Sequence, residues 1–305
     1  MFDLVRLRVL RTVADQGTLA AAAELLHLTP SAVSQQMAKL EREARCALIE
    51  RHGRRVRLTE EGKLLARHAE RILGAVEEAE ADLDERRGEV LGEFTVAAFP
   101  TAVRGLLPAV VVEMNERYPR LRLHLREVEP YDAIAQLGRG DVDLVIAQDW
   151  VNVPIAIPER LRSRDIGQDP VDVALPASHR LVDRPVLTPA DLADERWIAS
   201  TAGTICHDWL VSTFRGSGRE PDIVHQAGEF PTQLAMVAAG LGVALIPRLA
   251  GDLVPDGVRI RPIEPSMSRR IFAVWREESA RRPSVRAFVE SACQRWVQHH
   301  YSLHV

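Results

Sequence analysis

Cysteine is scarce in this chain, which has only three cysteines among its 305 residues. Cys46, Cys206 and Cys293 lie far apart and are odd in number, which argues against a disulfide framework and fits a reducing compartment. Long hydrophobic runs are also absent, since no apolar stretch approaches the roughly 18 residues of a membrane-spanning helix. The first residues lack the basic region and apolar core of a secretory signal. We therefore expect a cytoplasmic protein without a membrane segment.

An excess of positive charge is lacking as well, because 39 Lys and Arg residues stand against 43 Asp and Glu residues, a net charge of −4. This balance alone argues against a nucleic-acid-binding protein. The distribution is uneven, however: residues 1–58 carry +4, residues 59–92 carry −5 and residues 93–305 carry −3. A basic segment on an acidic body is expected when one module binds DNA phosphates. A charge of +4 over 58 residues is also unremarkable by itself, so charge leaves both interpretations open.

Motifs of catalysis and cofactor binding are missing. The chain has no Walker loop, no G-x-G-x-x-G sequence and no Cys/His set with zinc-ligand spacing. Cys206, His207 and Asp208 are residue types of nucleophilic catalysis, but neighbours on a helix diverge by about 100° and cannot form a hydrogen-bonded relay. The sequence therefore predicts no enzyme activity, no catalytic residue, no cofactor and no metal site.

The basic N-terminal segment has the pattern of three helices. Apolar residues recur at helical spacing over residues 4–15, and Thr18 can cap a second, alanine-rich helix over residues 19–26. Thr29 and Pro30 form a strong start for a third helix. The hydroxyl can accept a backbone N–H, and the N–H that proline lacks is not needed in the first turn.

The third helix spans about residues 30–43 and has two different faces. Val33, Met37 and Leu40 recur at steps of four and three, so they should face the core. The opposite face is small and polar near its N-terminus, as a helix that enters the DNA major groove requires. This face consists of Ser31, Ser34, Gln35, Ala38 and Arg42. Two short helices joined by a three-residue turn, the second with a polar outer face, are typical of a helix-turn-helix.

A short hairpin is predicted after the third helix. Residues 48–51 and 56–58 flank His52-Gly53-Arg54-Arg55, so the hairpin has a basic tip that can reach phosphates or the minor groove. The alternative is a three-helix core with a hairpin that plays no part in binding. The predicted DNA-contacting residues are Thr29, Ser31, Ser34, Gln35, Lys39, Arg42, Arg54 and Arg55.

A long helix is predicted next. Thr59 can cap it, its first turn holds Glu60 and Glu61, which the helix dipole favours, and the helical pattern continues to about Arg87. Apolar residues along it form a heptad seam, which is typical of a helix that pairs with another helix. We expect this seam to form a dimer, with packing inside one chain as the alternative. The seam consists of Leu65, Ala69, Ile72, Val76, Ala79 and Leu83.

These segments resemble a known family. Residues 17–41, GTLAAAAELLHLTPSAVSQQMAKLE, and residues 51–62, RHGRRVRLTEEG, strongly resemble the DNA-binding domain of the LysR-type transcriptional regulators. The heptad helix behind them does so too, and the resemblance continues to the C-terminus over essentially the whole chain. It departs at Ala44-Arg45-Cys46, where members usually carry a glycine turn, and at Ile49, where many carry Phe.

Residues 93–305 alternate between predicted strands and helices, which gives parallel sheets covered by helices. The first unit has strands at residues 94–98, 121–128 and 140–146, with helices over about 103–117 and 133–137. The second unit has strands at 171–175, 196–200, 222–226 and 243–246, with helices over 205–214 and 231–239. The chain then returns through a strand at 271–275 and a final helix over 283–299.

The resemblance implies an α+β multi-domain fold: an N-terminal winged helix-turn-helix, a long linker helix and two α/β subdomains of the periplasmic-binding-protein type. We expect the DNA-binding domain over residues 1–58, the linker helix over 59–90 and the effector-binding domain over 91–305. In the last of these, subdomain 1 comprises residues 91–164 and 268–305, and subdomain 2 comprises residues 165–267. The chain then crosses between the subdomains twice.

The effector is expected beyond the carboxyl ends of the strands, where loops and helix N-termini converge in α/β proteins. Thr101 and Thr201 both stand near helix starts, so their hydroxyls and nearby N–H groups favour a carboxylate or another anion. Each threonine alone is more often a plain helix cap, and the prediction rests on their convergence across a cleft between the subdomains.

The predicted effector-contacting residues also include aromatic and acidic side chains. The aromatic ones indicate an apolar or aromatic body, and the carboxylates leave room for an amine. We therefore expect a small organic acid or an amino-acid-like metabolite. The full set is Phe99, Pro100, Thr101, Ala102, Gln148, Asp149, Trp150, Thr201, Ala202, Gly203, Thr204, Glu229, Phe230 and Pro247.

The sequence thus predicts a sequence-specific DNA-binding transcriptional regulator whose activity is modulated by a small-molecule effector. It leaves open which effector, which target genes, and whether the outcome is activation or repression. The expected partners are double-stranded DNA with an inverted repeat, the effector and a second copy of the chain, with a tetramer where the effector-binding domains also pair. RNA polymerase is left open as a further partner. The alternative is a small-molecule-binding protein of the periplasmic type without gene control, which gives residues 1–62 no role.

Overall fold

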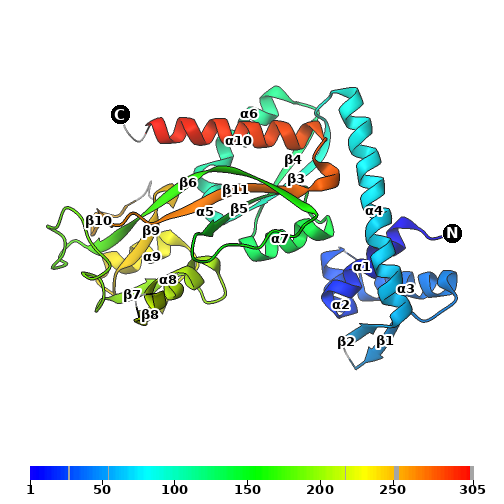
Figure 1. Cartoon of the computed structure of the whole chain (residues 1–305), viewed down its shortest axis with the longest axis horizontal. Coiled ribbons are helices and arrows are strands. Elements are labelled where there is room, and N and C mark those ends of the chain that lie inside the picture. The colour runs from blue at the N-terminus through cyan, green and yellow to red at the C-terminus, as the bar shows by residue number, and fades with distance from the viewer. Residues whose placement is uncertain (27, 54, 217, 251–253, 303–305) are drawn as a thin grey trace. The chain divides into compact units, whose positions relative to one another are not determined.

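The computed structural model describes residues 1–26, 28–53, 55–216, 218–250 and 254–302 (Figure 1). The chain divides into two compact units, one mainly of Met1–Glu89 and the other mainly of the residues that follow. No helix among the described residues has both the length and the apolar character needed to cross a membrane.

The N-terminal unit contains the three predicted helices, the hairpin and the long helix. Side-chain oxygens of Asp3, Thr18, Thr29 and Thr59 accept backbone N–H groups at the starts of its four helices. The predicted winged helix-turn-helix and long helix are therefore confirmed. The elements are α1 (Leu4–Gln16), α2 (Leu19–Leu25), α3 (Pro30–Ala44), β1 (Ile49–His52), β2 (Arg55–Leu58) and α4 (Glu60–Arg87).

The predicted seam of α4 has two halves in different surroundings. Ala69 has no exposed surface, and it packs with Leu65 in the apolar core of the N-terminal unit. Further along, Ile72 and Leu83 remain 39% and 55% exposed. The expectation that the whole seam faces a second chain is therefore wrong for Leu65 and Ala69, because α4 packs against α1 at these positions.

The second unit is built on a seven-stranded sheet with the strand order β10-β6-β11-β5-β3-β4, with β9 pairing β6 off this path. A separate two-stranded sheet joins β7 and β8 in parallel. The strands are β3 (Gly92–Ala98), β4 (Leu121–Glu127), β5 (Leu144–Trp150), β6 (Leu161–Pro176), β7 (Arg196–Ala199), β8 (Asp222–Gln226), β9 (Ala244–Pro247), β10 (Val258–Pro262) and β11 (Ser268–Arg276). The α-helices are α5 (Pro100–Gly105), α6 (Leu107–Arg117), α7 (Pro130–Arg139), α8 (Ile205–Gly216), α9 (Phe230–Ala238) and α10 (Pro283–Ser302), with 3-10 turns at Arg248–Ala250 and Glu277–Ser279.

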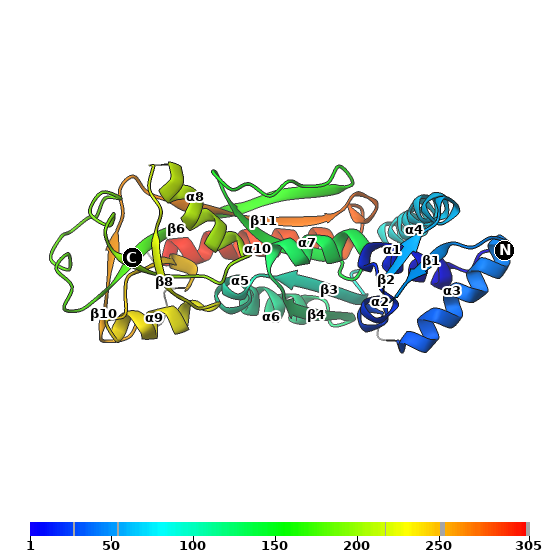
Figure 2. The same cartoon turned by 90° about the horizontal axis from the view of Figure 1, so that it is seen from below.

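Alternation along β3 builds a three-layer arrangement, since successive side chains of a strand point to opposite faces. Phe94, Val96 and Ala98 pack in one core with residues of α6 and α10. Ala97 packs in another core with Ala133 and other residues of α7 and β5. Figures 1 and 2 show α6 and α10 on one face of the sheet and α7 on the other.

The sheet is mixed, which corrects the expectation of parallel sheets. β3 pairs in parallel with β4 and β5, but β11 runs antiparallel to both β5 and β6. β6 is far longer than the strand predicted at 171–175: it pairs with β11 over residues 161–170 and with β9 and β10 over residues 171–176. The long strand β6 therefore links two halves of this unit: one half contains β3, β4, β5 and β11, and the other contains β9 and β10.

The predicted helix over residues 103–117 is interrupted at Leu106, where α5 ends and α6 begins. Pro108 explains the interruption. Proline lacks an N–H, and its ring collides with the carbonyl four residues earlier, here that of Arg104. The consequence for the site is that α5 is a separate short element carrying Thr101 and Arg104.

Candidate functional sites

The first candidate site is the outer face of α3. Its start is fixed by Thr29, whose Oγ1 accepts the N–H of Ala32 at 3.1 Å. Val33, Met37 and Leu40 are at most 1% exposed, as predicted. The opposite side is therefore turned outward, and its exposed residues are Ser31, Gln35, Ala38, Lys39 and Arg42, with Ser34 half-buried beside them.

The hairpin behind α3 is held by a carboxylate. Glu41 Oε1 accepts the backbone N–H groups of Leu48 and Ile49 at 2.9 and 3.3 Å, so α3 fixes the chain that leads into β1. β1 and β2 pair antiparallel, and Arg55 is exposed on β2. Arg54, also predicted to contact DNA, lies outside the described residues. Apart from Arg54, the predicted DNA-contacting residues lie on α3, at its start, or on this hairpin.

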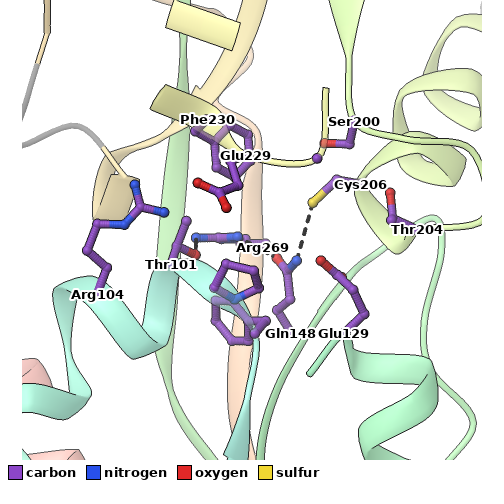
Figure 3. Close-up of a pocket in the computed structure, with 13 residues that line it drawn as sticks. Thr101, Arg104, Glu129, Gln148, Ser200, Thr204, Cys206, Glu229, Phe230 and Arg269 are labelled. Carbon is purple, nitrogen blue, oxygen red and sulfur yellow. Dashed lines mark hydrogen bonds between the residues drawn. The ribbon is translucent and has the colours of Figure 1, made fainter. Parts of the chain in front are cut away.

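The second candidate site is a cavity in the second unit, and a buried arginine stands at its centre (Figure 3). Arg269 has no exposed surface, and its guanidinium lies 5.0 Å from the centroid of the Phe99 ring. It donates from Nε to Asp169 Oδ2 at 2.8 Å, from Nη1 to Gln148 Oε1 at 2.8 Å and from Nη2 to Thr101 Oγ1 at 2.7 Å. Because the Thr101 oxygen accepts this bond, its own O–H remains available as a donor toward a ligand.

Both signs of charge line this cavity beyond Arg269. Arg104, Glu129 and Glu229 are among its lining residues, and no ion pair of these three occurs within the described part of the chain. Figure 3 shows the carboxylate of Glu229 turned toward Thr101 and Arg269. Burial raises the pKa of Glu129, while the positive charge of Arg269 acts in the opposite direction. A cationic group beside Glu129 would therefore favour its charged form.

Cys206 adds a thiol to the same cavity. Gln148 Nε2 donates to Cys206 Sγ at 3.2 Å, as Figure 3 shows. Burial raises the pKa of this thiol, with Arg269 acting in the opposite direction. The free space inside the cavity is only about 20 Å³, which is room for about one water-sized molecule.

A second cavity of about 20 Å³ lies next to the first. Ser200, Cys206 and Phe230 line both cavities, so they form the wall between the two. The remaining lining residues of the second cavity are Trp150, Val171, Ile198, Ala199, Trp209, Leu210, Gln233, Leu245 and Pro247.

The structure brings nine of the predicted effector-contacting residues to these two cavities. The first cavity is lined by Phe99, Pro100, Thr101, Gln148, Thr204, Glu229 and Phe230, and the second by Trp150, Phe230 and Pro247. Five predicted residues line neither cavity: Ala102, Asp149, Thr201, Ala202 and Gly203.

Asp149 and Thr201 are among those five, and both make other polar contacts. Asp149 accepts bonds from Arg270 Nη2 and Nε at 2.6 and 2.9 Å. Thr201 is exposed, and its carbonyl accepts a hydrogen bond from the hydroxyl of Thr204 at 2.7 Å. Thr204 directly precedes α8. Gly228, which follows β8 at a predicted strand end, also lines the first cavity, whereas the sequence did not indicate Arg104, Glu129, Ser200, Cys206 and Arg269 as effector-contacting residues.

Two family models match the chain. The model described as "Bacterial regulatory helix-turn-helix protein, lysR family" matches residues 4–63, and the model described as "LysR substrate binding domain" matches residues 87–296. The chain belongs to the LysR family of transcriptional regulators. It is therefore a DNA-binding transcriptional regulator with an effector-binding domain, and not an enzyme.

Relatives and solved structures match over nearly the full length. The hydrogen peroxide-inducible genes activator of Dickeya chrysanthemi is 27% identical over 309 residues, which cover 98% of this chain and 96% of that protein. A full-length OxyR variant from Pseudomonas aeruginosa matches with a TM-score of 0.71 at 22% identity, over 96% of this chain and 95% of that one. Full-length CbnR in complex with its target DNA matches with a TM-score of 0.54 at 23% identity, over 97% of this chain and 100% of that one. These likenesses to solved structures show a shared fold.

Proposed function

We propose that the protein regulates transcription in the cytoplasm as a dimer that binds an inverted repeat through two copies of α3. The outward face of α3 supports this, because Ser31 and Gln35 are small or amide-bearing and exposed where base edges would lie. Lys39, Arg42 and Arg55 are exposed around them and would meet phosphates. Two symmetric heads need two half-sites. Pairing of the effector-binding domains into a tetramer, and contact with RNA polymerase, belong to the same proposal.

Titration of DNA binding against salt tests the roles on this surface. Arg55→Ala should weaken binding to all sequences and reduce the salt dependence by about one counterion. Gln35→Ala should instead change the preference at one base pair, by roughly 1–3 kcal/mol. If the salt dependence of DNA affinity is unchanged in Arg55→Ala, the hairpin does not contact DNA. The DNA probe is the chain's own upstream region in a gel shift.

We propose that the effector is a small organic acid or an amino-acid-like metabolite bound in the Arg269 cavity. The observation that carries this is the opposite charge of the lining side chains. Arg104 and the Thr101 hydroxyl suit a carboxylate, and Glu129 and Glu229 suit an amine. The pair of Arg269 with Asp169, joined at 2.7 Å, is a fixed support for Thr101. Opposite charges in one small cavity favour a ligand that carries both.

A matched pair of threonine variants tests this site. After a ligand is found by thermal shift among organic acids and amino acids, its affinity is measured by calorimetry against Thr101→Val and Thr201→Val. Thr101→Val removes the hydroxyl that is hydrogen-bonded to Arg269, so binding should weaken by about three- to tenfold. Thr201→Val is the control, because Thr201 lines neither cavity. Equal affinity in both variants would place the effector elsewhere.

A response to hydrogen peroxide is the second candidate function, and Cys206 is the observation that favours it. The thiol lines the effector cavity, and the Dickeya relative is named for hydrogen peroxide. Against it stands the raised pKa of this thiol, because the thiolate is the reactive form. We therefore expect peroxide to leave DNA affinity unchanged. A change on peroxide treatment that Cys206→Ser abolishes would select this second function over the first.

A further inference from the structure

The second cavity differs in chemistry from the first. Trp150 and Trp209 stack beside it with ring centroids 3.7 Å apart and planes 9° apart. Leu210 and Leu245 extend the apolar lining. Within the described part of the chain, no charged side chain lines this cavity, whereas two arginines and two glutamates line the first one.

One polar group at the second cavity lacks a partner. Trp150 is 2% exposed, and its indole Nε1 has no hydrogen-bond partner among the described residues. The nearby amide of Gln233 is already used, because its Nε2 donates to Ser200 Oγ at 3.3 Å and to the Ala227 carbonyl at 2.9 Å. A buried donor without a partner destabilises a fold by about 1–3 kcal/mol, and an acceptor on a ligand in this cavity would offset that cost.

Together, the two cavities match an amphipathic ligand, with a charged end in the first cavity and an apolar end in the second. The charged end lies at Thr101 and Arg104, and the apolar end lies at Trp150 and Trp209. The shared wall includes Cys206, a small side chain whose thiol is hydrogen-bonded to the Gln148 amide. With about 20 Å³ of free space on each side, an aromatic ring enters only when this wall and the two cavities open toward each other.

We infer that the second cavity is a subsite for the apolar body of the effector, and that Trp150 Nε1 donates to an acceptor on that body. This inference rests on the proposed effector class, since the charged head must occupy the first cavity. The effector is then a carboxylate whose aromatic or branched body carries an oxygen acceptor, such as a phenol or a ketone.

The test uses a panel of carboxylate ligands whose side groups increase in size. The probes are α-amino acids and the corresponding carboxylates without the amine, each with a methyl, isobutyl, benzyl or 4-hydroxybenzyl body. Leu245→Phe fills the second cavity and should weaken the benzyl and 4-hydroxybenzyl ligands by about tenfold or more, while the methyl ligands are unchanged. Leu241→Phe is the control, because Leu241 is exposed and lines neither cavity.

The indole donor has a separate variant. Trp150→Phe keeps an aromatic ring but removes the N–H, so it should weaken the 4-hydroxybenzyl ligand more than the benzyl ligand, by about threefold or more. An equal loss for both ligands would overturn the role of Nε1 as donor.

The outcomes separate the subsite from the effector class. One outcome is that Thr101→Val lowers the affinity of every ligand in the panel, while Leu245→Phe does not lower the affinity of the large ligands more than that of the small ones. The effector class then stands and the subsite is wrong. If no member of the panel binds the native protein, the effector class and the subsite are both overturned. The subsite is supported if Leu245→Phe, and not Leu241→Phe, lowers the affinity for the ligands with large bodies and leaves the methyl ligands unchanged.

Discussion

Arg45 is the only non-glycine residue in the described chain with a positive φ, at 56°. It forms the C-cap of α3, where a left-handed residue commonly ends a helix and glycine is usual. A side chain in this region costs about 1–2 kcal/mol because Cβ approaches the following carbonyl. The turn that leads to the hairpin therefore keeps its left-handed shape although glycine is absent from it.

Arg45→Gly is expected to stabilise the N-terminal unit. Removing Cβ relieves the left-handed strain, and the greater freedom of glycine in the unfolded chain offsets part of the gain, so the free energy of unfolding should rise by about 0.5–1 kcal/mol. Urea denaturation followed by circular dichroism measures this. Arg45→Ala, which keeps Cβ, serves as the control and should show no gain. A loss of stability in Arg45→Gly would mean that the Arg45 side chain contributes more than the strain costs.

Glu129 supports a prediction on pH. Burial raises its pKa above the ordinary value of 4.5, so ionising it in the fold costs free energy that the unfolded chain does not lose. When the pH is below this ordinary pKa, the carboxyl is protonated in both the folded and the unfolded state, and the free-energy cost of ionising it in the fold vanishes. Glu129→Gln should therefore be more stable than the native chain near neutral pH, with a difference that shrinks as the pH falls toward 4.5. Denaturation at several pH values, with the exposed Glu116→Gln as control, checks this; a pH-independent difference would contradict it.

The residues that sequence reasoning found and missed at the cavity differ in a physical way. Thr101 and Gln148 follow or end apolar strands, so the rule that ligands lie beyond strand ends leads to them. Arg269 comes from 168 positions beyond Thr101, near the start of β11, where three polar residues precede the apolar run. From sequence alone, a charged residue at this position is expected to be exposed to solvent. Arg269 is buried because its guanidinium pairs with Asp169, which the sequence pattern does not show.

At the scale of elements, the helices and caps were predicted well because their signals are local. Thr18, Thr29 and Thr59 act as helix caps as their positions indicate. The first half of β6 was not predicted, because several residues between Arg162 and Asp165 are charged and exposed. Those residues hide the strand pattern, and only the pairing of β6 with β11 creates the strand. Long-range pairing is the information that periodicity in one segment lacks.

The exposed half of the α4 seam supports a prediction on assembly. Ile72 is 39% exposed and lies on the same side of the helix as Val76 and Leu83. If this half pairs with a second chain, Ile72→Asp places an unpaired charge in the contact and should split the dimer. Light scattering measures the mass. Arg67→Asp introduces the same side chain on the opposite side of the helix and should leave the dimer intact. An unchanged mass for Ile72→Asp would move the contact away from α4.

For the molecule as a whole, we expect the effector to change the affinity for DNA or the bending of the DNA. A ligand does this only through a difference in its affinity for the states that bind DNA well and poorly. The long strand β6 runs through both halves of the effector-binding unit, while Thr101 and Gln148 come from one half and Cys206 and Phe230 from the other. A ligand in the cavity therefore contacts both halves at once, and it can favour one arrangement of them.

This coupling must act in both directions. If the effector changes operator affinity by a factor that corresponds to roughly 1–3 kcal/mol, the operator must change effector affinity by the same factor. Calorimetric titration of the effector with and without operator DNA, set beside DNA titration with and without effector, measures the two factors. Thr101→Val should reduce effector affinity while the DNA affinity of the ligand-free protein stays unchanged, because Thr101 lies in the cavity and not on α3. Unequal factors from the two titrations would mean that the effector binds at a site or in a stoichiometry other than the one proposed.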